Sequence, residues 1–267
     1  MELSRRVALD GKQLDEVDDR IIIQSIEPAA AKYQINTTAA ACGFGSRITG
    51  TRRDSMDIVV KFSINEKSYK PEKREKVLDK VKKWAANGGI MTVNYKPGQR
   101  ISVILAQAPG EGDIKNRGNQ YALTFRAYGI PYWEQDPAES AVQTAANTNK
   151  LIKIDGSAET QIDVTLKNIS GQTINTATVQ ISKSGASRTI QLTNLGLAGN
   201  EALVIDHKDG LIRIRILGAN GTSYRSAMAN RTSGSDDDLK LAPGNWNARY
   251  TADRACEMTV SWRARYL

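Results

Sequence analysis

The fold of this 267-residue chain is decided by the stretch Met56-Asp57-Ile58-Val59-Val60-Lys61-Phe62-Ser63-Ile64. Every even position in it is apolar, whereas Asp57, Lys61 and Ser63 at odd positions are polar. Successive side chains of a strand point to opposite faces of a sheet, so this two-residue period predicts a strand with one buried and one solvated face. Such half-solvated strands are typical of antiparallel sheets.

Other parts of the chain repeat the same period. It recurs in residues 121–127, 162–167, 212–216 and 256–263. A parallel α/β fold would instead show continuous apolar strands alternating with helices, and the sequence has no such succession. The chain is therefore predicted to be a mainly β protein.

One segment, residues 71–86, has the period of a helix instead. Pro71 stands in the first turn, and acidic residues come early and lysines late, as the helix dipole favours. Val77, Leu78, Val81, Trp84 and Ala85 form an apolar stripe at helical spacing. Asn87-Gly88-Gly89 is a stop signal, so we expect an amphipathic helix lying against a sheet with its lysines in solvent.

The alternation is interrupted between Glu134 and Lys150 by a polar segment that contains Pro137. Low hydrophobicity with proline is typical of a linker. We therefore predict a first domain at 1–135, β-rich with one helix, a linker at 136–150, and an all-β sandwich at 151–267.

Composition excludes several classes of protein. The chain is 40% apolar and 25% charged, which is ordinary for a globular protein and unlike a disordered one. Its longest apolar runs are far shorter than the roughly 20 residues of a membrane span, and no signal peptide is recognisable behind Met1. We expect a protein made in the cytoplasm with no membrane partner.

Catalytic and metal-binding motifs are not recognisable. The two cysteines, Cys42 and Cys256, are far apart, and His207 is the only histidine, which excludes a disulfide framework and polyhistidine metal sites. His207 lies where a strand is expected to end in a turn. The acidic run Asp236-Asp237-Asp238 lacks the ligand spacing of a calcium loop. We predict no catalytic residue, no cofactor and no metal.

The charge of the chain is basic and uneven. The net charge is +8, with 22 Lys and Arg against 16 Asp and Glu in residues 1–135 and 15 against 13 in the remainder. A basic balance is compatible with nucleic-acid binding, although a solvated basic surface that keeps the protein soluble is the favoured explanation. Trp133, Trp246 and Trp262 offer aromatic rings for sugar stacking, but core packing is their commoner role.

The segment Cys42–Gly50 is rich in glycine but lacks the spacing and the Gly-Lys-Ser/Thr ending of a phosphate loop. We interpret it as a long loop between two strands that leads into Thr51-Arg52-Arg53. Its small residues suit close packing against another surface.

In this order, the features resemble the distal tail (Dit) proteins of long-tailed bacteriophages and related prophages. The resemblance covers most of both domains as a succession of weak patterns rather than one sharp motif. The residues that carry it are Gly50–Asp54, Met56–Ile64, the helix ending in Lys82-Lys83-Trp84, Gly89–Arg100, Tyr121–Trp133, Leu241-Ala242-Pro243-Gly244-Asn245-Trp246 and Trp262–Tyr266.

The resemblance implies an N-terminal domain similar to tail-tube subunits and a C-terminal galectin-like sandwich. It implies a homohexameric ring at the virion tail tip that joins the tail tube protein to the tail-associated hub protein, and in some members to receptor-binding proteins. DNA would pass through the lumen without specific binding. Neither domain has room for an inserted sugar-binding module.

A closed ring needs heterologous contacts between neighbouring copies. We expect one of these surfaces around the glycine-rich segment, and the candidate interface residues are Gly43, Phe44, Gly45, Ser46, Arg47, Arg52 and Arg53. Lysines lining a lumen would retain the passing duplex. We therefore expect the helix lysines Lys73, Lys76, Lys80 and Lys83 to lie away from it.

Two other classes stay open at this stage. A carbohydrate-binding adhesion module would rest on the sandwich and Trp246, and a nucleic-acid binder would rest on net charge. An enzyme is not expected, because nothing assembles a nucleophile, a base and an oxyanion partner.

Overall fold

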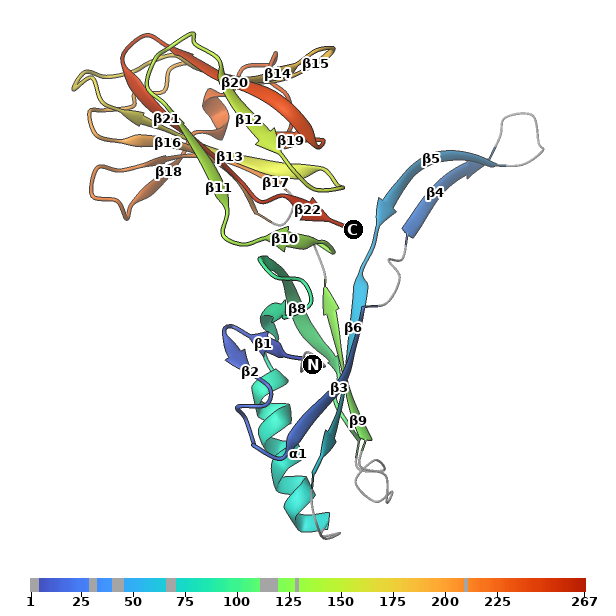
Figure 1. Cartoon of the computed structure of the whole chain (residues 1–267). Helices are drawn as coiled ribbons and strands as arrows, with labels where there is room; N and C mark the ends of the chain where they lie inside the picture. Colours follow the sequence, from blue (N-terminus) through green and yellow to red (C-terminus); the bar gives the residue numbers. More distant parts are fainter. Residues whose placement is uncertain are drawn as a thin grey trace. The chain divides into compact units, whose positions relative to one another are not determined.

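A computed structural model describes residues 5–28, 33–39, 46–65, 71–110, 120–127, 130–208 and 211–267. The chain divides into two compact units, unit 1 at Met1–Trp133 and unit 2 at Glu134–Leu267. Most strands of each unit pair with strands of the same unit (Figure 1). The fold is mainly β, as the alternation predicts.

Unit 1 contains an antiparallel sheet in the order β2-β1-β7-β8-β9-β6-β3. The decisive stretch forms β6 (Met56–Ile64), with the bounds that its period predicts. The other strands are β1 (Val7–Leu9), β2 (Lys12–Gln13), β3 (Ile21–Pro28), β7 (Gly89–Val93), β8 (Gln99–Gln107) and β9 (Gln120–Ala127).

The two faces of this sheet differ as the sequence pattern requires. On one face the apolar side chains of β6 and β9 are buried, and the Phe62 and Tyr121 rings lie 5.6 Å apart. On the other face Lys61 stands opposite Ala122, and Asp57 stands opposite Arg126. We call this second side, over β3, β6 and β9, the open face.

Helix α1 (Pro71–Ala85) covers the apolar face and ends one residue earlier than predicted. Val77, Leu78, Val81 and Ala85 are fully buried, and the Trp84 ring meets Phe125 edge-on at 6.1 Å. Arg74, four residues before Leu78, is also buried, so the covered stripe is wider than its apolar residues alone indicate.

Gly88 ends the helix for a steric reason. Its φ is +63°, and its amide donates to the Ala85 carbonyl at 2.9 Å. A Cβ at this position would lie 2.1 Å from the carbonyl oxygen of Val103 in β8. Only glycine fits here, because the turn needs a left-handed residue pressed against a neighbouring strand.

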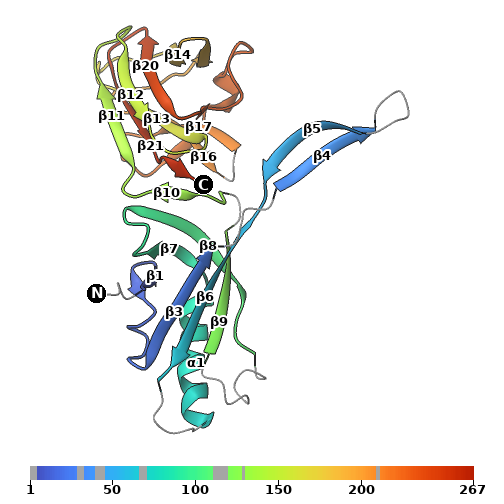
Figure 2. The same cartoon turned by 45° about the vertical axis from the view of Figure 1, so that its right-hand side comes forward.

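A hairpin of β4 (Tyr33–Ala39) and β5 (Ser46–Arg53) forms a separate two-stranded sheet in unit 1. We call it the arm. β5 continues after two residues into β6, as Figure 2 shows. The expectation of a loop through residue 50 is wrong for residues 46–50, which are strand.

The reason for this error lies in Gly50. It pairs with Asn36 directly beside a bulge between Asn36 and Thr37. Glycine inside a strand often marks a bulge, so here it did not signal a loop. The neighbouring Ile48, Thr49 and Thr51 have high strand propensity.

Unit 2 consists of two antiparallel sheets that share one hydrophobic cluster. The first sheet contains β11 (Glu139–Gln143), β13 (Thr160–Asn168), β16 (Ala202–Lys208), β17 (Leu211–Leu217), β18 (Tyr224–Ser226), β19 (Lys240–Leu241) and β21 (Cys256–Trp262). The second contains β12 (Lys150–Ile154), β14 (Ala177–Lys183), β15 (Ala186–Leu192) and β20 (Gly244–Ala252). The remaining elements are β10 (Trp133–Gln135), β22 (Arg265–Tyr266) and a 3₁₀ turn at Met228–Asn230.

The segment 136–150, predicted to be a linker, contains β11. This strand pairs with β21 from Glu139–Trp262 to Gln143–Met258. None of its five residues is buried, because it lies at the edge of its sheet. An edge strand with no fully buried side chain needs no strong apolar alternation in its sequence.

Candidate functional site

The arm exposes apolar side chains that a stable domain normally covers. Tyr33, Ile35 and Ile48 are 59%, 56% and 61% exposed. The described side chains of β4, residues 33–38, are all exposed. Neither arm strand pairs with any other described strand.

An isolated two-stranded hairpin is at best marginally stable in water. Exposed apolar side chains gathered on such a hairpin mark a surface that another protein covers. The arm is therefore a candidate docking element, and Tyr33 and Ile35 are members of it that the sequence analysis missed. The two-residue alternation of Tyr33, Ile35 and Thr37 was the pattern in the sequence that could have predicted this strand.

Four of the predicted interface residues, Ser46, Arg47, Arg52 and Arg53, fall on the arm. Gly43, Phe44 and Gly45 lie outside the described residues. Ser46, Arg47 and Arg52 belong to β5, where they pair with Ala39, Thr38 and Gln34.

Arg53, the last predicted interface residue, lies at the base of the arm. Its guanidinium carbon is 4.6 Å from the centre of the Tyr132 ring, and Nη2 is 3.6 Å from Met56 Sδ. Lys96 lies over the Trp133 ring at 5.2 Å. Burial and the nearby Arg53 charge both lower the pKa of Lys96. Through its contacts with Tyr132 and Met56, Arg53 connects the arm to the body of unit 1.

The open face carries matched charges. Arg126 and Asp57 form a two-pronged ion pair, with Nη2 to Oδ2 at 2.9 Å. Lys61 and Glu27 form a second pair at 2.8 Å. Hydrogen bonding by Lys61 holds the pKa of the Glu27 carboxyl below its ordinary value. The charges of these four side chains cancel one another on the open face.

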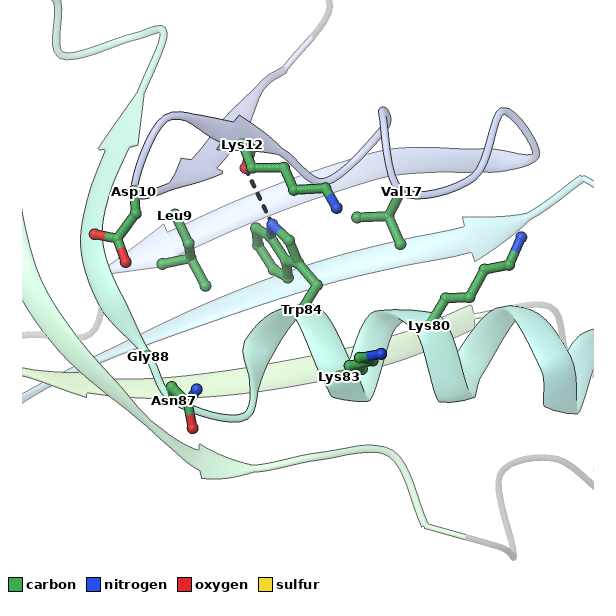
Figure 3. Close-up of a pocket in the computed structure, with 9 residues that line it drawn as sticks. All are labelled: Leu9, Asp10, Lys12, Val17, Lys80, Lys83, Trp84, Asn87 and Gly88. Carbon is green, nitrogen blue, oxygen red and sulfur yellow. Dashed lines mark hydrogen bonds between the residues drawn. The ribbon is translucent and has the colours of Figure 1, made fainter.

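The helix side of unit 1 is basic instead. Lys73, Lys76, Lys80 and Lys83 are all exposed on α1, on the layer that covers the opposite side of the sheet from the open face. Between α1 and the β1–β2 turn lies a pocket of about 570 Å³. Figure 3 shows Lys12, Lys80 and Lys83 arranged around Trp84 at this pocket.

The sole histidine pairs with a carboxylate. His207 Nδ1 lies 3.3 Å from Asp163 Oδ1, and no nucleophilic side chain among the described residues hydrogen-bonds to the histidine. Burial raises the pKa of the Cys256 thiol to about 11, so it stays protonated and unreactive near neutrality. Within the described ranges there is no group of three potential metal ligands. No described helix is long and apolar enough to span a membrane.

The three tryptophans considered for sugar stacking are core residues. Trp133, Trp246 and Trp262 are at most 6% exposed. Trp246 is also covered by Lys183, whose Nζ is 4.4 Å from the ring centre, and its indole donates to the Ala242 carbonyl at 2.9 Å. The ring on which the carbohydrate hypothesis rested is therefore not accessible to a sugar.

No protein-family model and no curated protein sequence matches the chain. Among solved structures it is similar to the Dit protein of phage SPP1, described as a paradigm of the hub adsorption apparatus in phages that infect Gram-positive bacteria. That match has a TM-score of 0.71 at 14% identity and covers 98% of this chain and 99% of SPP1 Dit.

Chains of the phage P2 baseplate in its activated conformation, one with calcium and one with strontium, match with a TM-score of 0.47 at 11% identity. The first match covers 98% of this chain and 98% of the baseplate chain, and the second covers 97% of each. At the level of the fold, the resemblance seen in the sequence is confirmed: the chain has the fold of a phage Dit protein.

Proposed function

We propose that this protein is a distal tail protein, a structural component of the tail tip of a long-tailed phage or prophage. In this role it is made in the host cytoplasm and incorporated into the virion. Copies of the chain form a ring, with six as the expected number. The ring joins the tail tube to the hub and the host-binding proteins.

The observation that carries this proposal is the whole-chain match to SPP1 Dit. Both units take part in it, because it covers 98% of this chain and 99% of the other. A shared fold alone does not assign function. The exposed arm and the charge-paired open face support the role independently of the comparison.

The arm supports ring closure. A subunit in a closed ring offers one surface to a different surface on its neighbour. In the ring, the adjacent copy would cover the exposed side chains of Tyr33, Ile35 and Ile48. Removing apolar surface from water contributes roughly 25 cal/mol of binding free energy per Å². The proposed interface is thus the arm rather than a glycine-rich loop.

The open face supports passage of DNA. A duplex is retained by cations that neutralise its phosphates. On the open face the cations Lys61 and Arg126 are already paired with Glu27 and Asp57. We propose that this face borders the lumen and that the helix lysines lie on the outer wall.

Negative-stain images of the purified full-length protein test the ring. The expected result is particles with an open centre, built from several copies. A filter-binding titration with duplex DNA tests the lumen, and we expect negligible retention at physiological salt. Monomers in the images at every protein concentration, or tight salt-sensitive DNA binding, would contradict the proposal.

A further inference from the structure

The pocket between α1 and the β1–β2 turn, shown in Figure 3, combines an apolar floor with a basic rim. Leu9, Val17 and the half-buried Trp84 supply the floor, and Lys12, Lys80 and Lys83 supply the rim. Neither the ring interface nor the lumen proposed above uses this surface. We propose that the pocket binds an acidic peptide segment of another protein, with an apolar side chain seated on Trp84.

The pocket is rigidly built. The Trp84 indole donates to the Lys12 carbonyl at 3.0 Å, which ties the helix to the β1–β2 turn. On its other side the same ring packs edge-on against Phe125. A preformed apolar surface accepts a ligand side chain without a large ordering cost.

Of the three lysines on the rim, one forms an ion pair with a described carboxylate. Lys80 binds Asp18 at 2.9 Å, whereas Lys12 and Lys83 have no carboxylate partner in the part of the chain that the structure describes. Asp10 is the one acidic residue among the described residues that line the pocket, and its Oδ1 accepts the Ile90 amide at 2.8 Å. Among the described residues that line the pocket, three lysines stand against one carboxylate, so an anion complements this lining.

A peptide fits this pocket better than a nucleic acid does. The cations surround one concave pocket of about 570 Å³ with an apolar floor. Phosphate backbones are instead tracked by extended basic grooves. In a carboxylate-rich segment with one aliphatic side chain, the carboxylates would pair with the lysines of the rim and the aliphatic side chain would pack on the apolar floor.

The segment is expected to come from a different protein. The acidic run Asp236–Asp238 is paired locally, because Asp236 lies 3.8 Å from Arg188, Asp237 binds Arg231 and Asp238 binds Lys240. The other acidic segment, Asp15–Asp19, contains Val17, which already lines the pocket. A second copy therefore does not offer this run freely. This choice of occupant rests on the proposed function, in which the protein joins other tail components.

The test uses 5-fluorotryptophan-labelled full-length protein and a blocked pentapeptide, EDLDE. The chain has four tryptophans, and the Trp84 signal is identified by its loss in Trp84→Phe. We expect EDLDE to shift the Trp84 resonance selectively, and the shift to shrink at high salt. The peptides KKLKK and EDGDE are the controls for charge and for the apolar side chain, and both should bind more weakly.

Matched variants locate the site. Lys12→Gln with Lys83→Gln should weaken EDLDE binding about three- to tenfold. Lys76→Gln with Lys82→Gln removes the same charge from α1 outside the pocket and should leave binding unchanged. No shift of Trp84, equal losses in both double variants, or stronger binding of duplex DNA than of EDLDE would overturn the proposal. Because peptide binding does not require a ring, failure of the proposal is distinguishable from failure of the proposed function.

Discussion

Two hairpins of this protein have similar lengths and opposite surroundings. In the β16–β17 hairpin of unit 2, Leu203, Ile205, Ile214 and Ile216 are buried in the core of the sandwich. In the β4–β5 arm of unit 1, the apolar side chains stand in solvent. The first hairpin also pairs on both sides, with β13 and with β18, whereas neither arm strand pairs with a further strand among the described residues.

We interpret this difference as one between residues that stabilise the fold and residues that we propose to contact a second molecule. A hairpin inside a sandwich is stabilised by its own chain, so substitutions of its apolar residues should change the stability of unit 2. The arm has no such cover within the described part of unit 1, so substitutions of its apolar residues should instead change the proposed assembly. The predictions below test this separation, from the largest expected effect to the smallest.

Amide exchange should differ most between the two hairpins. In the unassembled protein, amides of β16–β17 should exchange at least about a thousandfold more slowly than those of the arm. Amides of β16–β17 should exchange only when unit 2 unfolds, whereas amides of the arm should exchange through local opening of the hairpin. Hydrogen–deuterium exchange with peptide-level mass spectrometry measures this. Similar protection of the two hairpins in a monomer would break the comparison.

Truncation in the covered hairpin should be costly. Ile205→Ala should lower the free energy of unfolding of unit 2 by about 2–5 kcal/mol, because Ile205 is fully buried and the variant leaves a cavity. Urea unfolding followed by tryptophan fluorescence measures the loss. Ile35→Ala in the arm is the matched control, and an equal loss in that variant would show that the arm is part of a folded core.

The body of unit 1 should be sensitive to acid through Asp18, which is nearly buried beside Arg20 and Lys80. A hydrogen bond from Arg20 holds the pKa of the Asp18 carboxyl well below its ordinary value, and Lys80 adds to this against the opposing effect of burial. The contribution is therefore complete above the unfolded pKa of about 4 and is lost as the pH falls below it.

Asp18→Asn should accordingly destabilise unit 1 by about 1–2 kcal/mol at neutral pH, since Arg20 and Lys80 are partly solvent-screened. The difference from the wild type should shrink in chemical unfolding below about pH 4. A deficit that stays constant with pH would assign the loss to packing instead.

The smallest effect on stability is expected in the arm. Ile48→Ser in the unassembled protein should change the free energy of unfolding by no more than about 0.5 kcal/mol, because the side chain is already in water. Thermal unfolding at low protein concentration is the measurement. A loss as large as that of Ile205→Ala would mean that Ile48 is covered within its own chain.

Local patterns explain which elements could be predicted from the sequence. β6 and α1 were predicted nearly to the residue because two-residue alternation, Pro71 and Asn87-Gly88-Gly89 all act locally. β11 left no signal because no side chain of an uncovered edge strand needs to be apolar. Residues 46–50 of the arm are strand where the glycine-rich pattern predicts loop, because Gly50 is adjacent to a bulge.

The candidate sites were harder to predict because they depend on register and packing. Asp57 and Arg126 are 69 residues apart in sequence, and only the pairing of β6 with β9 places them together. Lys12 and Lys83 likewise meet at one pocket only when α1 packs beside the β1–β2 turn. The basic excess was visible in the sequence, but its division between two faces of a sheet was not.

The central claim is that copies of the chain assemble through the arm. Light-scattering mass of the full-length protein and of the Ile35→Ser, Ile48→Ser double variant tests it most directly. The account predicts a wild-type mass of several times 29.2 kDa, about 175 kDa for six copies, and a single-chain mass for a folded variant. An assembly of unchanged mass in the variant, or a wild-type monomer at every concentration, would contradict it.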